Sequence, residues 1–209
     1  MTQIQRRQMA SGKDKKVIAF VLAAGCSKRF GKQMKQLLAF RGKTILQTVV
    51  DEACGSKAVE VFTVLGCRWR KIKLALKPGR SRIIINRDYE RGFSTSLQAA
   101  VRKTLQLRAD ACLIVLADQP LVNAEFLNEL IAIYQGKEVS GVVSDYGGVI
   151  GTPAILDKKL FPDVMKLKGE IGAKQLLEGR TDVIKVKARQ EMLTDVDTEE
   201  DYRKILKIR

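Results

Sequence analysis

The chain has 209 residues, of which 45% are hydrophobic and 29% charged, as is typical of a soluble globular protein with one domain or two small ones. The 38 Lys and Arg outnumber the 23 Asp and Glu, and the net charge of +15 indicates a polyanionic partner: nucleic acid, an anionic membrane or a phosphate-rich small molecule. Histidine is absent, which excludes Ser/His/Asp and Cys/His catalysis and histidine-bound metals. Any chemistry must therefore use carboxylates, Lys, Arg, the backbone or a metal held by oxygen.

The charge is distributed unevenly along the chain. Residues 1–110 carry 24 Lys and Arg against 7 Asp and Glu, whereas residues 111–209 carry 14 against 16. The N-terminal half is therefore suited to attract an anion, and the C-terminal half could hold a cation.

Two features bear on the cellular compartment. Lysines precede an apolar run and Gly25-Cys26, as in a lipoprotein signal, but the run at residues 17–24 is only about eight residues long, far below the roughly 20 that span a bilayer. We therefore favour a polar, frayed basic tail at residues 1–15. The cysteines lie far apart without a CxxC pair, so we expect reduced thiols in a cytoplasmic protein and no disulfide. They are Cys26, Cys54, Cys67 and Cys112.

Residues 16–135 alternate short apolar runs with amphipathic stretches, the pattern of stacked βα units. Residues 17–22 form a continuous apolar run, as expected for a central parallel strand that is buried on both faces. Further strands are predicted at 59–65, 83–85 and 111–116, and helices at 44–54, 68–76, 95–107 and 123–134, the last with Asn123 as its N-cap. The expected buried face of the helix at 95–107 consists of Leu97, Ala100, Val101 and Leu105.

The pattern loosens after residue 135. Short strands predicted at 139–144 and 153–156, with a glycine turn between them, indicate a lid or accessory part. Helices are expected near 158–165 and 171–177, a strand at 183–186, and a closing helix at 198–208. These elements predict one α/β domain with an insertion-like C-terminal part.

The glycine loop LAAGCSKRFG, residues 22–31, directly follows the first strand. Ligands of open α/β sheets bind outside the carboxyl ends of the strands, so a binding site is expected here. Small residues let backbone N–H groups approach a phosphate chain, and positive charge is added by Lys28, Arg29, Lys32 and Lys35. The loop is neither a Walker A motif nor a GxGxxG fingerprint, and the alternative is a glycine turn with solvated lysines.

Carboxylates occur at two further places. Asp118 follows the strand at 111–116, at the same sheet edge as the glycine loop, and a carboxylate beside a phosphate loop usually holds Mg²⁺. Asp195 and Asp197 alternate along an extended segment and therefore point the same way. The alternatives are a simple turn for Asp118 and a helix cap for the segment at 195–198.

Together these residues resemble the molybdenum cofactor cytidylyltransferase-like family, within the glycosyltransferase-A-like pyrophosphorylase superfamily. The glycine loop, followed by Lys35 and the sequence QLL, is similar to the nucleotidyltransferase signature of that family. The matches span about residues 16–205. The other matches are given in chain order, with the segment of this chain first and the family motif that it resembles second: GFSTSL at 92–97 and GxxxSL, LADQP at 116–120 and LADQP, GTPA at 151–154 and G-T/H-P-x, GEIGAK at 169–174 and GDxGAR, and DVDTEED at 195–201 and DIDTPED.

The resemblance implies an α/β fold, a Rossmann-like three-layer sandwich with a mostly parallel mixed sheet of the nucleotide-diphospho-sugar transferase type. It implies a single domain at 16–209, with a nucleotide-binding part at about 16–135 and an acceptor-binding part at about 136–209. The implied enzyme is a nucleotidyltransferase that moves CMP from CTP to the terminal phosphate of molybdopterin, with Mg²⁺ as cofactor and pyrophosphate as product. Positioning and charge neutralisation then carry the rate.

The implied partners are CTP or another nucleoside triphosphate, a molybdopterin-type acceptor, and a molybdoenzyme or its chaperone. We expect a cytoplasmic monomer with neither nucleic acid nor membrane as a partner.

Residue roles follow on the matching positions. The resemblance implies as catalytic residues Arg29, Lys35 and Asp118, and as metal ligands Asp118 and Asp197. It implies as acceptor-binding residues Gly151, Thr152 and Pro153. It implies as nucleotide-binding residues Leu22, Ala23, Ala24, Gly25, Ser27, Arg29, Lys35 and Ser96.

Three assignments stay open. Lys32 competes with Lys35 for the phosphate role, because Lys35 follows Gly31 by four residues where the family has three; we favour Lys35 for the QLL that follows it. Either Asp195 or Asp197 could face the metal. The AAG of the loop favours CTP, and the alternatives are GTP with molybdopterin or a triphosphate with a sugar or alcohol phosphate.

A different class of function is a basic binding protein without catalysis. Residues 68–91 carry nine Lys and Arg around Trp69, which could contact the phosphates of a nucleic acid or an anionic lipid. Against this, the aromatic fraction is 6%, no RNA- or DNA-binding motif is present, and strand-like residues 83–85 interrupt the charge. A solvated basic face is the favoured interpretation.

Overall fold

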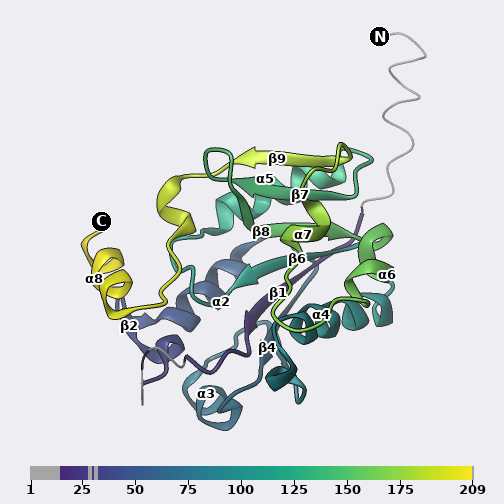
Figure 1. Ribbon diagram of the computed structural model, residues 1–209. Helices are drawn as coiled ribbons and strands as arrows, with labels where there is room; N and C mark the ends of the chain where they lie inside the picture. Colours follow the sequence, from purple (N-terminus) through teal and green to yellow (C-terminus); the bar gives the residue numbers. More distant parts are fainter. Residues whose placement is uncertain (1–14, 28–29, 31–32, 209) are drawn as a thin grey trace, which may run out of the picture.

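The computed structural model describes residues 15–27, 30 and 33–208, in which a seven-stranded sheet lies between two layers of helices (Figure 1). Its strands are β1 (Val17–Ala23), β4 (Glu60–Leu65), β5 (Ser81–Ile85), β6 (Ala111–Leu116), β7 (Gly141–Asp145), β8 (Ile150–Asp157) and β9 (Val183–Lys187). The α-helices are α2 (Ile45–Gly55), α3 (Trp69–Ala75), α4 (Ser94–Gln106), α5 (Ala124–Gln135), α6 (Phe161–Val164), α7 (Lys174–Leu177) and α8 (Glu199–Lys207). Smaller elements are the hairpin of β2 (Ala39–Phe40) and β3 (Lys43–Thr44) and the 3-10 helices η2 (Lys35–Leu37), η3 (Tyr89–Arg91), η4 (Lys158–Leu160) and η5 (Gln190–Leu193).

The sheet has the strand order β5-β4-β1-β6-β8-β7-β9. β1 pairs in parallel with β4 and β6, β8 runs antiparallel to both β6 and β7, and β9 is parallel to β7. All seven residues of β1 are buried, as predicted from its continuous apolar run. The predicted α/β fold with a mostly parallel mixed sheet is therefore confirmed.

Alternating residues of the strands feed two separate cores. Ala19 and Val21 of β1 belong to a cluster with α2 and α5, whereas Ile18 and Phe20 belong to a cluster with α4 and α6. Because successive side chains of a strand point to opposite faces, this division produces the three layers of Figure 1. Within the described part of the chain, no helix combines the length and the apolar character that crossing a bilayer requires.

Three of the helices, α2, α5 and α8, begin at a side chain that accepts a hydrogen bond from a backbone N–H of the first turn. Thr44 caps α2, Asn123 caps α5 as predicted, and Thr198 forms a capping box with Asp201 at α8. The cap of α8 fixes where the extended segment at 195–197 ends.

The strands predicted as a lid or accessory part belong instead to the main sheet. β7 pairs with both β8 and β9, and β8 pairs with β6. Val142 lies in one core and Val143 in the other, so β7 is buried on both faces, which a peripheral lid would not allow. The prediction that these strands form a lid or accessory part was therefore wrong.

Two helix predictions need correction. The helix expected at 171–177 begins only at Lys174. Gly169, ahead of it, adopts a φ of 65°, and its carbonyl accepts a hydrogen bond from the N–H of Ser94 at 3.0 Å. In α4, Leu105 is 53% exposed, and Thr104 takes the buried position that was expected for it.

Gly66 follows β4 directly beside the glycine loop. A Cβ at this position would lie 2.6 Å from the Cβ of Tyr89 and 2.8 Å from the carbonyl oxygen of Ala24. Only glycine therefore allows β4 and the start of the glycine loop to approach this closely.

We predict that Gly66→Ala destabilises the fold by about 2 kcal/mol or more, because backbone must move to accommodate the methyl group. Gly136→Ala is the matched control, since the nearest atom to its Cβ would be 3.4 Å away. Urea unfolding of both variants checks this, and equal stabilities would contradict it.

Candidate functional site

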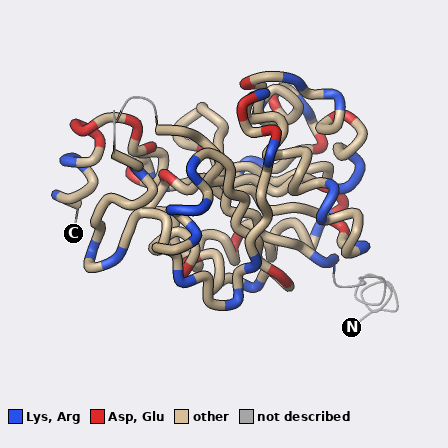
Figure 2. Tube along the Cα trace, turned by 90° about the horizontal axis from the view of Figure 1, so that it is seen from below, with Lys and Arg blue, Asp and Glu red and all other residues tan. Residues whose placement is uncertain are grey.

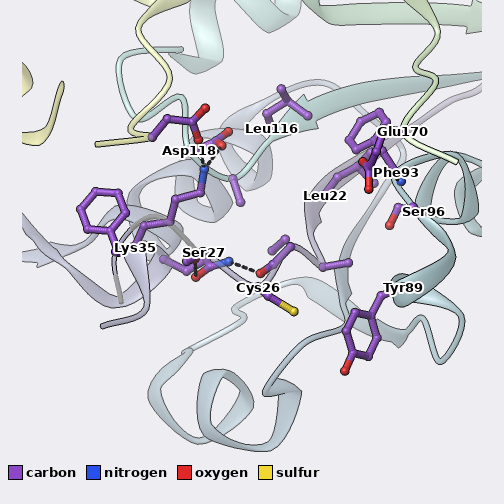
Figure 3. A pocket seen from close by; sticks show the side chains of 18 of the residues that line it. Leu22, Cys26, Ser27, Lys35, Tyr89, Phe93, Ser96, Leu116, Asp118 and Glu170 are labelled. Carbon is purple, nitrogen blue, oxygen red and sulfur yellow. Dashed lines mark hydrogen bonds and ion pairs between the residues drawn. The ribbon is translucent and has the colours of Figure 1, made fainter. Parts of the chain in front are cut away.

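A pocket of about 750 Å³ opens where β1 and β6 end, at the edge of the sheet predicted for the binding site. Lys35 and Asp118 lie at one end of the pocket, and Phe93, Ser96 and Glu170 lie at the other (Figure 3). The pocket is lined by Leu22, Ala23, Ala24, Gly25, Cys26, Ser27, Phe30, Lys35, Gln36, Tyr89, Glu90, Gly92, Phe93, Ser96, Leu116, Ala117, Asp118, Glu170 and Asp197. It therefore brings together the glycine loop, both predicted metal carboxylates and Ser96.

The glycine loop is held by the buried side chain of Gln36. Its amide Nε2 donates to the carbonyl of Gly25 at 2.9 Å, and its Oε1 accepts from the hydroxyl of Ser27, also at 2.9 Å. Ser27 has a φ of 54°, in the left-handed region that residues other than glycine rarely adopt. In the sequence, Gln36 served only as part of the QLL that identifies Lys35. Its position directly after that lysine in the motif was the signal that could have pointed to its role in holding the loop.

Lys35 lies between two carboxylates from distant parts of the chain. Its Nζ is 2.5 Å from Oδ2 of Asp118 and 2.7 Å from Oδ1 of Asp197 (Figure 3 shows the approach to Asp118). Burial by itself would lower the pKa of Lys35, but the charges and hydrogen bonds of Asp118 and Asp197 raise it above its ordinary value. The lysine is therefore a fixed cation at neutral pH.

Three other predicted cations of the glycine loop, Lys28, Arg29 and Lys32, lie outside the described residues.

Asp195 is directed at a different partner from Asp197. Its Oδ1 accepts a hydrogen bond from Nε2 of Gln119 at 2.9 Å. Burial, together with the nearby charges of Asp118 and Asp197, raises the pKa of the Asp195 carboxyl to about 6. Of the pair that the sequence left open, Asp197 is thus the one that lines the pocket and contacts Lys35.

The far end of the pocket is built on the start of α4. Ser96 is 3% exposed, and its Oγ accepts from Nδ2 of Asn86 at 3.1 Å. Asn86 also donates to Thr95 and orients Asp88 through a backbone N–H, so it fixes the whole turn before α4. Asn86 was not among the predicted site residues, because it carries no motif signal of its own.

The segment predicted to bind the acceptor does not line the main pocket. Gly151 and Thr152 instead line a smaller, mostly apolar cavity of about 190 Å³ that shares Phe93 and Leu116 with the main pocket. Pro153 lines neither cavity and follows a cis peptide bond. Thr152 is nevertheless connected to the site, because its hydroxyl donates to Oε1 of Gln119 at 3.0 Å.

A disulfide joins Cys26 of the glycine loop to Cys67, which follows Gly66. The prediction of four reduced thiols was therefore wrong for this pair, whereas Cys54 and Cys112 are free. Sequence separation concealed the pairing: the two cysteines are 41 residues apart, but adjacent parallel strands bring their Cα atoms within 5.0 Å. The N–H of Cys67 also donates to the carbonyl of Ala24, so the loop is fastened twice to the end of β4.

Two of the nine cations in the basic segment at 68–91 have a structural explanation. Arg80 donates to the carbonyls of Cys54, Ser56 and Ala58, which caps the C-terminal end of α2, and Arg82 forms an ion pair with Glu60. Figure 2 shows Lys and Arg distributed over several separate parts of the trace. The charge of this segment therefore does not by itself indicate a nucleic-acid surface.

The pocket offers oxygen ligands for a divalent cation. Carboxylate oxygens of Asp118 and Asp197 both approach one position, which the Nζ cation of Lys35 now holds. Among the described residues no group of three or more His, Cys, Asp and Glu side chains is arranged around a metal position. Two carboxylates completed by phosphate oxygens and water are the donor set that Mg²⁺ commonly takes, so the residues fit such an ion.

Comparison with known sequences identifies the family. The family model described as MobA-like NTP transferase domain matches residues 19–186, most of the chain. The chain belongs to the MobA-like NTP transferase family. As a member of this family it is a nucleotidyltransferase with a nucleoside triphosphate substrate. Asp195 and Asp197 lie beyond the matched residues.

Curated relatives of this family member carry different names. The purine catabolism protein PucB of Bacillus subtilis is 32% identical, over 89% of this chain and 94% of that protein. The nicotine blue oxidoreductase of Paenarthrobacter nicotinovorans is 26% identical, over 91% and 96% of the two chains. The molybdenum cofactor cytidylyltransferase of Escherichia coli is 24% identical, over 87% and 91%. The resemblance seen in the motifs is thus confirmed at the level of the family.

Solved structures support the same fold. The crystal structure of Rv0371c from Mycobacterium tuberculosis has a TM-score of 0.82 and 29% identity, and the match covers 93% of this chain and 98% of that chain. A complex of Rv0371c with manganese has a TM-score of 0.79 and 26% identity, covering 93% of this chain and 100% of that one. A divalent metal is therefore present in a structure of a similar protein.

We predict that the disulfide contributes about 3–4 kcal/mol to the free energy of unfolding, because it closes a loop of 41 residues in the unfolded chain. Cys67→Ser should lose this amount without reductant, whereas Cys54→Ser, at a free and half-buried cysteine, should lose much less. Urea unfolding with and without reductant measures both. Equal stabilities of Cys67→Ser and the parent chain without reductant would contradict the prediction.

Proposed function

We propose that this nucleotidyltransferase moves CMP from CTP to the terminal phosphate of molybdopterin, with Mg²⁺ as cofactor and pyrophosphate as the second product. The observation that carries the proposal is Lys35 held between Asp118 and Asp197 beside the glycine loop. The ordered motifs of the sequence and the name of the Escherichia coli relative support this substrate pair.

The two ends of the pocket would bind different parts of the triphosphate. The backbone of the glycine loop, from Ala23 to Ser27, cradles the phosphates, and Lys35 neutralises their charge together with Arg29. Leu22 and Ser96 contact the nucleoside at the other end, with Ser96 oriented by Asn86. Gln36 keeps the loop in its phosphate-binding conformation.

Asp118 and Asp197 would hold Mg²⁺, which when bound supplies positive charge next to the reacting phosphates. With the two carboxylates neutralised by such an ion, Lys35 would be available to contact the triphosphate. The lysine would keep its proton there, because the negative charge of the triphosphate favours the charged form of the amine, as the two carboxylates do in the structure.

The reaction itself asks for positioning more than for proton transfer. An ionised oxygen of the acceptor phosphate attacks the α-phosphorus; the new P–O bond forms as the bond from that phosphorus to the β-phosphate oxygen breaks, and pyrophosphate leaves. The nucleophile carries no proton to remove, so the absence of histidine is no obstacle. Lys35 and Arg29 stabilise the charge that moves onto pyrophosphate.

The acceptor is assigned to the Gly151, Thr152 and Pro153 side of the molecule, at about 136–209. The small apolar cavity at Gly151 and Thr152 suits an uncharged part of the acceptor, and it adjoins the main pocket through Phe93 and Leu116. The alternative substrate pairs within the family are GTP with molybdopterin and a nucleoside triphosphate with a sugar or alcohol phosphate.

A thermal-shift panel of CTP, GTP, ATP and UTP, each with Mg²⁺, tests the choice of nucleotide. We expect CTP to stabilise most, by about 2.7 kcal/mol at 100 times its dissociation constant. NADPH belongs in the panel because one relative is named an oxidoreductase. Stabilisation by NADPH alone, or by no triphosphate at saturation, would contradict the proposal.

Asp118→Asn tests the carboxylate at the centre of the site. We expect pyrophosphate release from CTP and molybdopterin to fall at least about 100-fold, because charge stabilisation of this kind is worth several kcal/mol. Asp163→Asn, which removes only a surface ion pair with Lys166, is the control and should retain activity. An Asp118→Asn variant with near-normal turnover would refute this role.

A further inference from the structure

Gln119 is the buried residue next to Asp118, and its side-chain amide is used in two directions. It is 1% exposed and lines neither cavity. Its Nε2 donates to Oδ1 of Asp195 at 2.9 Å, and its Oε1 accepts from the Thr152 hydroxyl at 3.0 Å. The amide therefore connects the segment that carries Asp197 to the start of β8.

Each segment is in turn anchored on its other side. Val196, between the two aspartates, is fully buried with Phe40 and Ile205, and its N–H donates to the carbonyl of Asp118 at 3.0 Å. On β8, the carbonyl of Thr152 accepts from the hydroxyl of Tyr146 at 2.6 Å. Gln119 thus gives two parts of the fold a direct hydrogen-bonded link beside Asp118, in addition to the hydrogen bond that Gln190 donates to the carbonyl of Tyr146.

The chemistry of the link requires an amide. The Asp195 carboxylate needs a hydrogen-bond donor, and the Thr152 hydroxyl, which donates here, needs an acceptor. An amide side chain supplies both groups. An ionised Glu at position 119 could accept from Thr152 but would face Asp195 with a like charge. A Met would fill the space without either hydrogen bond and leave buried polar groups unpaired.

We infer that Gln119 is a positioning residue that holds the Asp195–Asp197 segment and the Gly151–Pro153 segment in fixed positions relative to Asp118. It acts through Asp197 on the metal side and through Thr152 on the acceptor side, while the glycine loop and Ser96 are held independently by Gln36 and Asn86. Its effect on turnover rests on the proposed function; its effect on the two segments does not.

Hydrogen exchange measured by mass spectrometry tests, without any substrate, whether Gln119 holds the two segments in place. In Gln119→Met, peptides covering 190–198 and 148–155 should exchange at least about fivefold faster, as loss of roughly 1 kcal/mol of local stability requires, and peptides of α4 should be unchanged. Gln47→Met is the matched control, since Gln47 also bonds in two directions, to Asp51 and to Lys77, but on α2. Normal exchange in both segments of Gln119→Met would overturn the inference.

Moving the negative charge from position 195 to position 119 tests the positioning role in catalysis. Gln119→Glu should lower kcat at least about 30-fold with a KM for CTP within about threefold, because the triphosphate contacts remain while the reacting groups are misplaced. Adding Asp195→Asn restores a donor and acceptor pair with the same net charge, so the double variant should recover most of kcat. Failure to recover, or a normal kcat in Gln119→Glu, would overturn the role. If the parent chain itself shows no turnover, the proposed function fails and the exchange measurement still decides the inference.

Discussion

The site depends on one cation placed among converging carboxylates. Asp118 and Asp197 both contact Lys35, and the half-buried Asp195 lies near enough for burial and their charges to raise its pKa. Like charges gathered in a partly buried place repel strongly unless a cation lies between them. The three groups come from η2, the end of β6 and the approach to α8, so this interaction ties three distant parts of the chain into one site.

The neighbouring structure keeps that arrangement in place. Gln36 and the disulfide fix the glycine loop at the end of β1, and Gly66 lets the end of β4 approach it. On the other side, Gln119 relates the carboxylate segment to β8. A reaction that requires positioning rather than proton transfer is served by such rigid supports, because small displacements of reacting groups are costly in rate.

The sequence predicted those features that depend on local pattern. The strand of residues 17–22, its glycine loop and the carboxylate after β6 follow from apolar runs that end in small or acidic residues, and the sheet places them together as expected. What it missed depends on distant contacts: the Cys26–Cys67 bond, the support of Ser96 by Asn86, and the pairing of β7 with β8 and β9. Periodicity carries no information on such partners.

Crystals grown with Mn²⁺ and a non-hydrolysable CTP analogue give the most direct test of the central claim, because the anomalous scattering of manganese locates the metal independently of the protein. The account predicts manganese bound to carboxylate oxygens of Asp118 and Asp197, with Nζ of Lys35 moved onto the phosphates. Manganese bound elsewhere, or Lys35 still paired with both carboxylates while the triphosphate occupies the pocket, would contradict it.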